Sequence, residues 1–186
     1  IKISGLDDFE MEVLLDDIKS LNLGNIFSLE DDKIIKIIDS NTLIGKYKIL
    51  KKYPSTLNIE IKKTSFLARI NQNSKIFILG SNGKLSKNNK SIEELPYIFG
   101  NPNIIDFLNL KKIIDNTNIS YDEIKNFYFF KSKRWDLELK NNIIIKLSGD
   151  NLKESLDNAF SFLNDSNFNN IKIIDARIHN QIILND

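Results

Sequence analysis

The sequence predicts an α+β fold: a strand–helix–helix–strand–strand unit, then a mostly antiparallel β domain with a packed helix and a C-terminal edge strand. Before Ser65 helical periodicity occurs beside strand patterns, whereas after Ser65 short apolar runs typical of strands predominate. The chain has 186 residues, 41% of them hydrophobic. It is therefore long enough to bury the core of one medium domain or of two small ones.

The chain is expected to begin with a strand and a helix. Residues Ile1–Ser4 alternate as a strand does, and the pattern stops at Gly5. Asp7 and Glu10 have the spacing of a capping box, which marks the start of a helix. The apolar residues expected on one face of this helix are Phe9, Leu14, Ile18 and Leu21.

A second helix and two strands complete the first part. Ser28 and Asp31 form a second capping signature, ahead of Ile34, Ile35, Ile37 and Ile38. The strand-like runs Tyr47–Lys52 and Thr56–Lys62 flank Pro54, which favours a turn. Alternation in the second run predicts that three side chains point inward, namely Leu57, Ile59 and Ile61. We place the first domain at residues 1–66 and the second at residues 67–186.

The second part consists mostly of strands. Phe66–Ile70 and Lys75–Leu79 are apolar runs, and Ser81-Asn82-Gly83 predicts a hairpin because Asn and Gly tolerate positive φ. A helix is expected from Pro102, with one-turn spacing at Ile105, Leu108 and Lys112. Three further strands are predicted, at Phe127–Phe130, Arg134–Leu139 and Ile143–Leu147.

The alternation in Arg134–Leu139 predicts which side chains point inward. Trp135, Leu137 and Leu139 share one face, and Arg134, Asp136 and Glu138 share the other. The pattern favours Trp135 as a core residue over a binding anchor. Asp150 then caps a helix whose apolar stripe is Leu152, Leu156, Phe160 and Leu163.

The chain ends in two strands, Ile171–Ile178 and Gln181–Asn185, joined by the two-residue turn His179-Asn180. This turn would pair Ile178 with Gln181, Arg177 with Ile182, Ala176 with Ile183 and Asp175 with Leu184. One face, the expected core, would carry Ile174, Ala176, Ile178 and Ile183. The other, the expected recognition surface, would carry Ile173, Asp175, Arg177, Ile182 and Leu184. The last strand would keep a free edge, which invites another strand.

Composition excludes several functional classes. The formal net charge is +1, which supplies no long-range attraction for nucleic acid or an anionic membrane, so nucleic-acid binding is not expected. There is no cysteine, which excludes disulfides, thiolate catalysis and Cys-ligated zinc. No apolar run approaches the roughly 20 residues of a membrane helix, and there is no signal peptide. Because Ile1 opens a strand pattern without a preceding Met, we expect an excised portion of a longer protein.

No catalytic motif stands out. His179 is the only histidine and is interpreted as a turn residue, and the chain contains no nucleophile elbow, phosphate loop or dinucleotide fingerprint. The acidic pairs lie at expected helix starts or on solvated helix faces, where capping and the helix dipole explain them. Phe127–Phe130 is interpreted as a buried strand and not as a base-stacking platform. We expect no enzyme activity, no cofactor and no metal.

The segments Leu95–Gly100, Lys133–Leu139 and Ile174–Arg177 resemble motifs of the bacterial FtsQ/DivIB family, and the resemblance extends over nearly the whole chain. In the first part, the segments that resemble a POTRA domain are Ile1–Gly5, Leu23–Phe27 and Lys52–Ile61. POTRA domains also occur in outer-membrane assembly and two-partner secretion proteins. The family is indicated by the three segments named first, which resemble the FtsQ β domain.

Three positions depart from the family's pattern. The segment Lys63–Ala68 keeps only the alanine of the Glu-Arg-x-Pro-x-Ala motif that often follows the POTRA domain. Gly80 stands where an Asp is usual, and Ile178 where an aromatic residue often follows the arginine. We therefore expect partner contacts at these positions to differ in detail.

The resemblance implies a non-enzymatic organiser of cell division. Such a protein has a short cytoplasmic tail and one inner-membrane helix, both absent from this sequence, which hold the remaining portion in the periplasm. Its β domain binds FtsB in complex with FtsL, and its POTRA domain is associated with FtsK and with septal synthase proteins. The complex regulates septal peptidoglycan synthesis.

The resemblance and the free edge together select the candidate partner-binding residues: Arg134, Arg177, Ile178, Asn180, Gln181, Ile182, Ile183 and Leu184. The resemblance implies that FtsB adds a strand at the edge and that both arginines pair with an acidic residue of FtsB. A solvated or internally paired arginine is the alternative for each. The alternative for the chain is a POTRA-type chaperone or scaffold module of an outer-membrane assembly or secretion system, and a more distant one is an envelope hydrolase.

Overall fold

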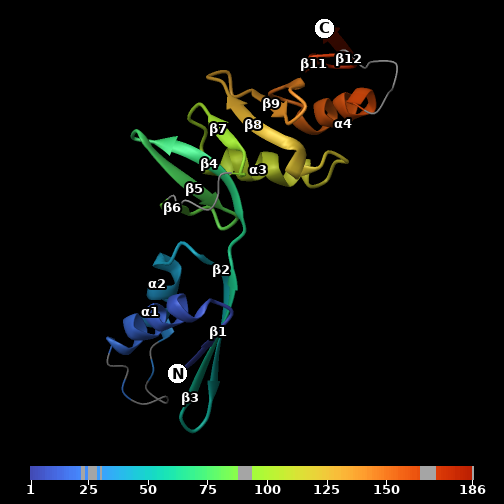
Figure 1. The fold of residues 1–186 in the computed structure, drawn as a ribbon. Helices are drawn as coiled ribbons and strands as arrows, with labels where there is room; N and C mark the ends of the chain where they lie inside the picture. The colour runs from blue at the N-terminus through green and yellow to red at the C-terminus, as the bar shows by residue number, and fades with distance from the viewer. Residues whose placement is uncertain (22–23, 25–28, 30, 88–93, 164–170, 186) are drawn as a thin grey trace. The chain divides into compact units, whose positions relative to one another are not determined.

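The computed structural model describes residues 1–21, 24, 29, 31–87, 94–163 and 171–185, and it confirms the predicted α+β class (Figure 1). The chain forms two compact units. The first comprises Ile1–Phe66 together with Leu79–Ser86, and the second comprises Leu67–Ile78 together with Lys87–Asp186. The division into domains at residues 66 and 67 stays a prediction.

The first unit has the predicted order of elements: β1 (Lys2–Ser4), α1 (Asp8–Lys19), α2 (Asp31–Ser40), β2 (Ile44–Lys52) and β3 (Thr56–Lys63). The strands form a sheet in the order β1-β3-β2, in which β1 is parallel and β2 antiparallel to β3. Both helices lie on one side of this sheet (Figure 1). The core between the helices and the sheet is built from buried residues that include Leu14, Ile18, Ile34, Ile38, Leu57, Ile59 and Ile61.

The first helix begins as predicted, but one of its apolar residues does not face the core. The Asp7 side chain accepts a hydrogen bond from the Glu10 backbone N–H at 2.9 Å, which confirms the capping box. Phe9 is 75% exposed, contrary to the predicted face. It lies five residues before Leu14, or about 140° around the helix, and therefore points away from the sheet. The predicted cap at Ser28 lies outside the described residues.

The hairpin predicted at Ser81-Asn82-Gly83 is present. It joins β5 (Lys75–Gly80) to β6 (Leu85–Lys87), and the Gly80 N–H donates to the Lys84 carbonyl at 3.0 Å. The Asn82 side-chain amide donates to the backbone carbonyls of Thr42 and Ile44 at 3.0 and 2.9 Å. These bonds fix the turn within the first unit.

The remaining elements are β4 (Phe66–Gln72), β7 (Tyr97–Phe99), α3 (Ile104–Ile114), β8 (Ile124–Phe129), β9 (Trp135–Leu139), β10 (Ile144–Leu147), α4 (Leu152–Leu163), β11 (Ile173–Ile178) and β12 (Gln181–Asn185). Their sheet has the strand order β12-β11-β10-β9-β8-β7-β4-β5-β6. The pairs β4–β7, β7–β8 and β10–β11 are parallel. The last of these requires a crossover, which α4 provides.

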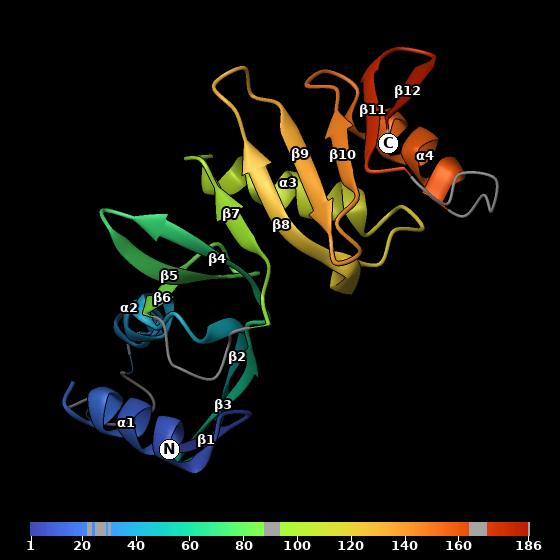
Figure 2. The same cartoon turned by 45° about the horizontal axis from the view of Figure 1, so that its top comes forward.

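Two helices cover one face of this sheet. Figure 2 shows α3 behind β8 and β9, and the ring of Phe107 on α3 meets that of Phe127 edge-on, with centroids 5.2 Å apart. Trp135 is 2% exposed and its ring centroid lies 6.1 Å from that of Phe107, so the core interpretation of Trp135 is confirmed. Helix α4 begins at Leu152, two residues after the predicted cap Asp150, and packs against β10 and β11. Among the described residues of the second unit, no helix lies on the opposite face.

Candidate partner-binding site

The C-terminal strand β12 forms one end of the sheet. In the strand order it neighbours only β11, so within the described part of the chain its other edge has no partner strand. The backbone N–H and C=O groups of an edge strand alternate in direction, and half of them point away from its neighbour. The edge predicted from the sequence is therefore present.

The register of the terminal hairpin differs from the prediction by one residue beyond a β-bulge. Ile178 pairs with Gln181 as expected, but Ile183 pairs with Asp175 and not with Ala176. Leu184 likewise pairs with Ile174 and not with Asp175. Between these pairs, Ala176 and Arg177 oppose the single residue Ile182, which is the arrangement of a bulge.

The bulge exchanges the two faces of β12 relative to the prediction. Leu184 shares the helix-covered face with buried Ile174, and Ile182 and Leu184 are both half-buried. Ile183 lies on the open face beside Asp175 and is 39% exposed. Ile178, which we expected in the core, is 52% exposed because it lies beyond the bulge at the end of β11. The exposed isoleucines of the edge are thus Ile178 and Ile183.

The turn between the two strands is tied to α4. Asn180 has φ of 57°, in the left-handed region that Asn tolerates, which fits the two-residue turn predicted here. The His179 Nδ1 atom lies 2.7 Å from the Glu154 carboxylate on α4, and its Nε2 atom lies 2.9 Å from the Asn180 side-chain amide. These contacts hold the exposed end of the hairpin against a packed helix.

Arg177 is held by the carboxylate two residues before it. Its Nε donates to Asp175 Oδ1 at 2.7 Å, its Nη2 donates to Asp175 Oδ2, and its backbone N–H donates to Oδ1 at 3.2 Å. The hydrogen bonds from the Arg177 side chain lower the pKa of the Asp175 carboxyl below its ordinary value. The Arg177 side chain is nevertheless 43% exposed. It is therefore oriented by Asp175 and still accessible to a partner.

Arg134 is positioned in a similar way but is more enclosed. Its Nε donates to Asp136 Oδ1 at 3.1 Å, and its guanidinium lies 4.3 Å from the centroid of the Phe130 ring. Asp136 is 5% exposed, and burial raises the pKa of its carboxyl even though Arg134 opposes that shift. Phe130 is 38% exposed. Phe130 carries no sequence signal for a role in this site, because an aromatic residue at the end of an apolar run is typical of a buried strand.

One row of side chains connects the two arginines to the edge strand. The cross-strand pairs place, in order over β8 to β12, Tyr128, Asp136, Lys146, Asp175 and Ile183. Paired residues point to the same face, so Lys146 lies between the two carboxylates that hold Arg134 and Arg177. The strands that bring these residues together are far apart in sequence. Both arginines are internally paired, and their predicted contact with a partner stays a prediction.

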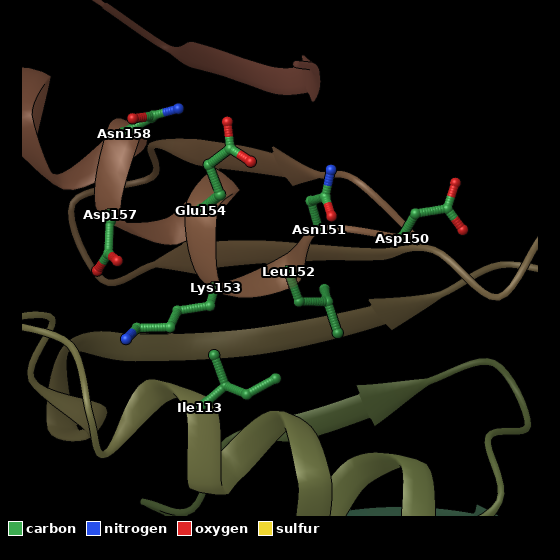
Figure 3. Close-up of a pocket in the computed structure, with 8 residues that line it drawn as sticks. All are labelled: Ile113, Asp150, Asn151, Leu152, Lys153, Glu154, Asp157 and Asn158. Atoms are coloured by element: carbon green, nitrogen blue, oxygen red, sulfur yellow. The ribbon is translucent and has the colours of Figure 1, made fainter. Parts of the chain in front are cut away.

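A second surface feature lies at the start of α4. A hollow of about 710 Å³ between α3 and the start of α4 is lined by Ile113, Asp150, Asn151, Leu152, Lys153, Glu154, Asp157 and Asn158. In Figure 3, Ile113 points from α3 toward the residues that project from α4. No group of three or more His, Cys, Asp or Glu residues in the described chain could hold a metal ion. None of the described helices is long and apolar enough to cross a bilayer.

Comparisons with known proteins agree with the resemblance drawn from the motifs. Residues 1–63 match the family described as POTRA domain, FtsQ-type, and residues 68–177 match Cell division protein FtsQ/DivIB, C-terminal. The chain is 26% identical over 183 residues to the cell division protein FtsQ of Rickettsia bellii, strain RML369-C. It is 28% identical over 187 residues to that of Rickettsia felis, strain ATCC VR-1525 / URRWXCal2. Each alignment covers 96% of this chain and 68% of the relative.

A solved structure is also similar. The major extracytoplasmic domain of the trans isomer of the cell division protein DivIB from Geobacillus stearothermophilus aligns with a TM-score of 0.39 and 10% sequence identity. The alignment covers 57% of this chain and 96% of that chain. The similarity is too low to support an argument about this site.

Proposed function

This chain belongs to the FtsQ/DivIB family of bacterial cell-division proteins, and we propose that it is a non-enzymatic scaffold that recruits partners by strand addition at β12. A role in the division machinery follows from the family. The partners proposed are FtsB and FtsL at the β domain, with FtsK and septal synthase proteins near the POTRA domain. We further propose that an N-terminal membrane helix anchors the protein in the inner membrane, that this portion lies in the periplasm, and that the complex regulates septal peptidoglycan synthesis.

The free edge of β12 is the observation that carries this proposal. An extended segment laid along an edge strand gains main-chain hydrogen bonds, and alternate side chains supply specificity. Along β12 the exposed side chains are Gln181, Ile183 and Asn185, while Ile182 and Leu184 are half-buried on the opposite face of the strand. A partner strand would therefore meet an apolar side chain, Ile183, next to the charged row on the open face.

The two arginines would recognise an acidic side chain of the partner. A guanidinium carries five N–H donors, and Asp175 uses only two atoms of the Arg177 side chain. The remaining N–H groups of the guanidinium point away from Asp175. They can donate to a second carboxylate. Because Asp175 pairs with Ile183, the partner residue would lie close to both the arginine and the edge.

Titration calorimetry of the chain with a peptide fragment of FtsB tests the proposal. Ile183→Asp places a charge on the exposed face of β12 and is expected to weaken binding at least about tenfold, as loss of an interface anchor does. The control is Ile105→Asp, which makes the same change at an isoleucine of α3 that is 63% exposed. Equal affinities of the wild type and Ile183→Asp, or no binding by the wild type, would overturn strand addition at β12.

A further inference from the structure

The sheet of the first unit has a basic face. On the side turned away from α1 and α2, the three strands present five exposed lysines, namely Lys2, Lys46, Lys48, Lys52 and Lys62. The one acidic residue on this side is Glu60, which pairs with Lys48. We call these six residues the lysine face. It lies opposite the buried side chains Leu57, Ile59 and Ile61 of the same sheet.

Two other lysines of β2 and β3 lie on the opposite face of the sheet. Lys51 and Lys63 pair with the buried residues Leu57 and Ile44, so they lie on the side of the sheet that the helices cover. Lys51 lies 3.0 Å from Asp31 of α2, and Lys63 lies 3.0 Å from the helix cap Asp7. Lysines on the helix side are thus neutralised within the unit.

The lysine face lacks this neutralisation. Within the part of the chain that the structure describes, no carboxylate lies within 4.0 Å of the ammonium group of Lys2, Lys46, Lys48, Lys52 or Lys62. Lys46 and Lys62 are direct cross-strand partners, and like charges in that position destabilise a sheet. An anionic ligand over this face would offset the repulsion.

The charge of the first unit is divided between its two sides. The acidic residues of the helices and the cap are Asp7, Asp8, Glu10, Glu12, Asp16, Asp17, Asp31, Asp32 and Asp39. They lie on the helix side, and the unpaired lysines lie on the other. The net charge of +1 for the whole chain therefore conceals a strongly basic surface.

Apolar side chains accompany the lysines. Leu50 is 41% exposed on the lysine face, paired with Asn58, and Tyr53 is 63% exposed in the turn that joins β2 and β3. Lysine beside leucine and tyrosine is the composition of surfaces that lie in the headgroup region of a bilayer. From Lys46 to Lys52 the charges extend roughly 20 Å along β2, and across three strands they extend about 10 Å.

From this arrangement we propose that the lysine face binds the surface of a bilayer that contains anionic phospholipid. Compact ammonium groups spread over a flat sheet match a planar array of phosphate groups. A folded acidic protein would be expected to meet arginine side chains, whereas β1, β2 and β3 contain lysines and no arginine. The attraction is electrostatic, with Leu50 and Tyr53 entering the headgroup layer.

Vesicle flotation of the whole chain tests the proposal. Vesicles of phosphatidylcholine with about 30% phosphatidylglycerol are expected to bind it, vesicles of phosphatidylcholine alone to leave it free, and binding to fall from about 0.05 to about 0.5 M salt. In the triple variant Lys46→Gln, Lys48→Gln, Lys62→Gln, we expect the partition coefficient to fall on the order of a hundredfold, since each lysine contributes about fivefold. Leu50→Ser is expected to lower it severalfold.

The matched control removes the same charge elsewhere. Lys36 on α2, Lys140 and Lys153 are exposed lysines outside the lysine face, and their triple glutamine variant is expected to bind as the wild type does. Equal binding to neutral vesicles, or equal losses in the two triple variants, would overturn the proposal. So would absence of vesicle binding together with lysine-face-dependent capture of an acidic peptide such as polyglutamate, which would assign the face to a protein. The assay contains no FtsB, so its failure and the failure of strand addition are separate results.

Discussion

Asp175 of β11 lies directly opposite Ile183 of β12, because a bulge at Ala176 and Arg177 shifts the register of the terminal hairpin. The pairing puts an exposed isoleucine of the free edge beside a carboxylate that holds Arg177. An apolar contact and an oriented cation are thus neighbours on the face that a partner strand would extend.

The first prediction concerns Arg177. Arg177→Gln is expected to weaken binding of an FtsB peptide by about thirtyfold, the effect of losing an arginine hot spot worth roughly 2 kcal/mol. A loss of stability is also expected, because Asp175 is 7% exposed and its buried charge would lose the guanidinium that balances it. Calorimetric titration and urea unfolding measure the two effects. Lys140→Gln removes one charge at an exposed site of the same unit and is the control. Equal losses of affinity in both variants would count against a specific contact.

Arg134 is expected to stabilise the fold in the same way as Arg177, because its carboxylate partner is also buried. Arg134→Gln leaves the Asp136 carboxylate, which is 5% exposed, without the guanidinium that balances its charge. Breaking such a pair costs about 3 kcal/mol. The double variant Arg134→Gln, Asp136→Asn should recover most of this loss, as measured by urea unfolding. If both variants were equally unstable, the loss would come from packing against Phe130 and not from the unpaired charge.

Glu138 is expected to make stability depend on pH below about 4.5. Hydrogen bonds from Asn126, Lys125 and Tyr128 lower the pKa of its carboxyl from 4.5 to about 2. A lowered pKa in the folded state adds stability above the unfolded pKa, and this stability is lost as pH falls through the folded pKa. The contribution is up to about 3 kcal/mol at neutral pH.

Urea unfolding between pH 4.5 and pH 2 checks this effect. The free energy of unfolding of Glu138→Gln should depend less on pH over that range, because glutamine has no carboxylate to protonate. Glu123→Gln removes an exposed carboxylate from the turn before β8 and serves as the comparison. Identical slopes of unfolding free energy against pH in the wild type and Glu138→Gln would show that ionised Glu138 does not stabilise the fold.

Gly100, just after β7, is expected to tolerate no side chain. Its φ is 92°, and a Cβ atom there would lie 2.3 Å from the Phe129 carbonyl oxygen. Gly100→Ala is expected to lower the free energy of unfolding by about 2 kcal/mol or more, because strain and backbone overlap combine. At Gly149 the nearest atom to a Cβ lies at 3.8 Å, so Gly149→Ala should be nearly neutral. Thermal unfolding of the two variants compares them directly.

Local patterns were sufficient for most of the elements. The capping box at Asp7, the hairpin at Asn82 and the strand around Trp135 were all predicted, since each depends on residues close together in sequence. The face of Phe9 was predicted wrongly, because Phe9 lies about 140° around the helix from Leu14. Lys46, Lys48 and Lys52 of β2 fall on one face of an alternating strand, so the basic face could have been predicted from this pattern, but the net charge concealed it.

The sequence by itself determined that the chain folds as α+β, that it ends in a two-residue hairpin and that its motifs are those of a division-protein family. Alternation, capping and turn chemistry are local, and a single sequence displays them. Only the tertiary structure decided that Asp136, Lys146 and Asp175 form one row and that Ile183 lies on the open face. Those facts depend on the parallel pairing of β10 with β11 and on one extra residue in a bulge. The first joins segments that are far apart in sequence, and the second interrupts the period of two within β11, so alternation along one strand predicts neither.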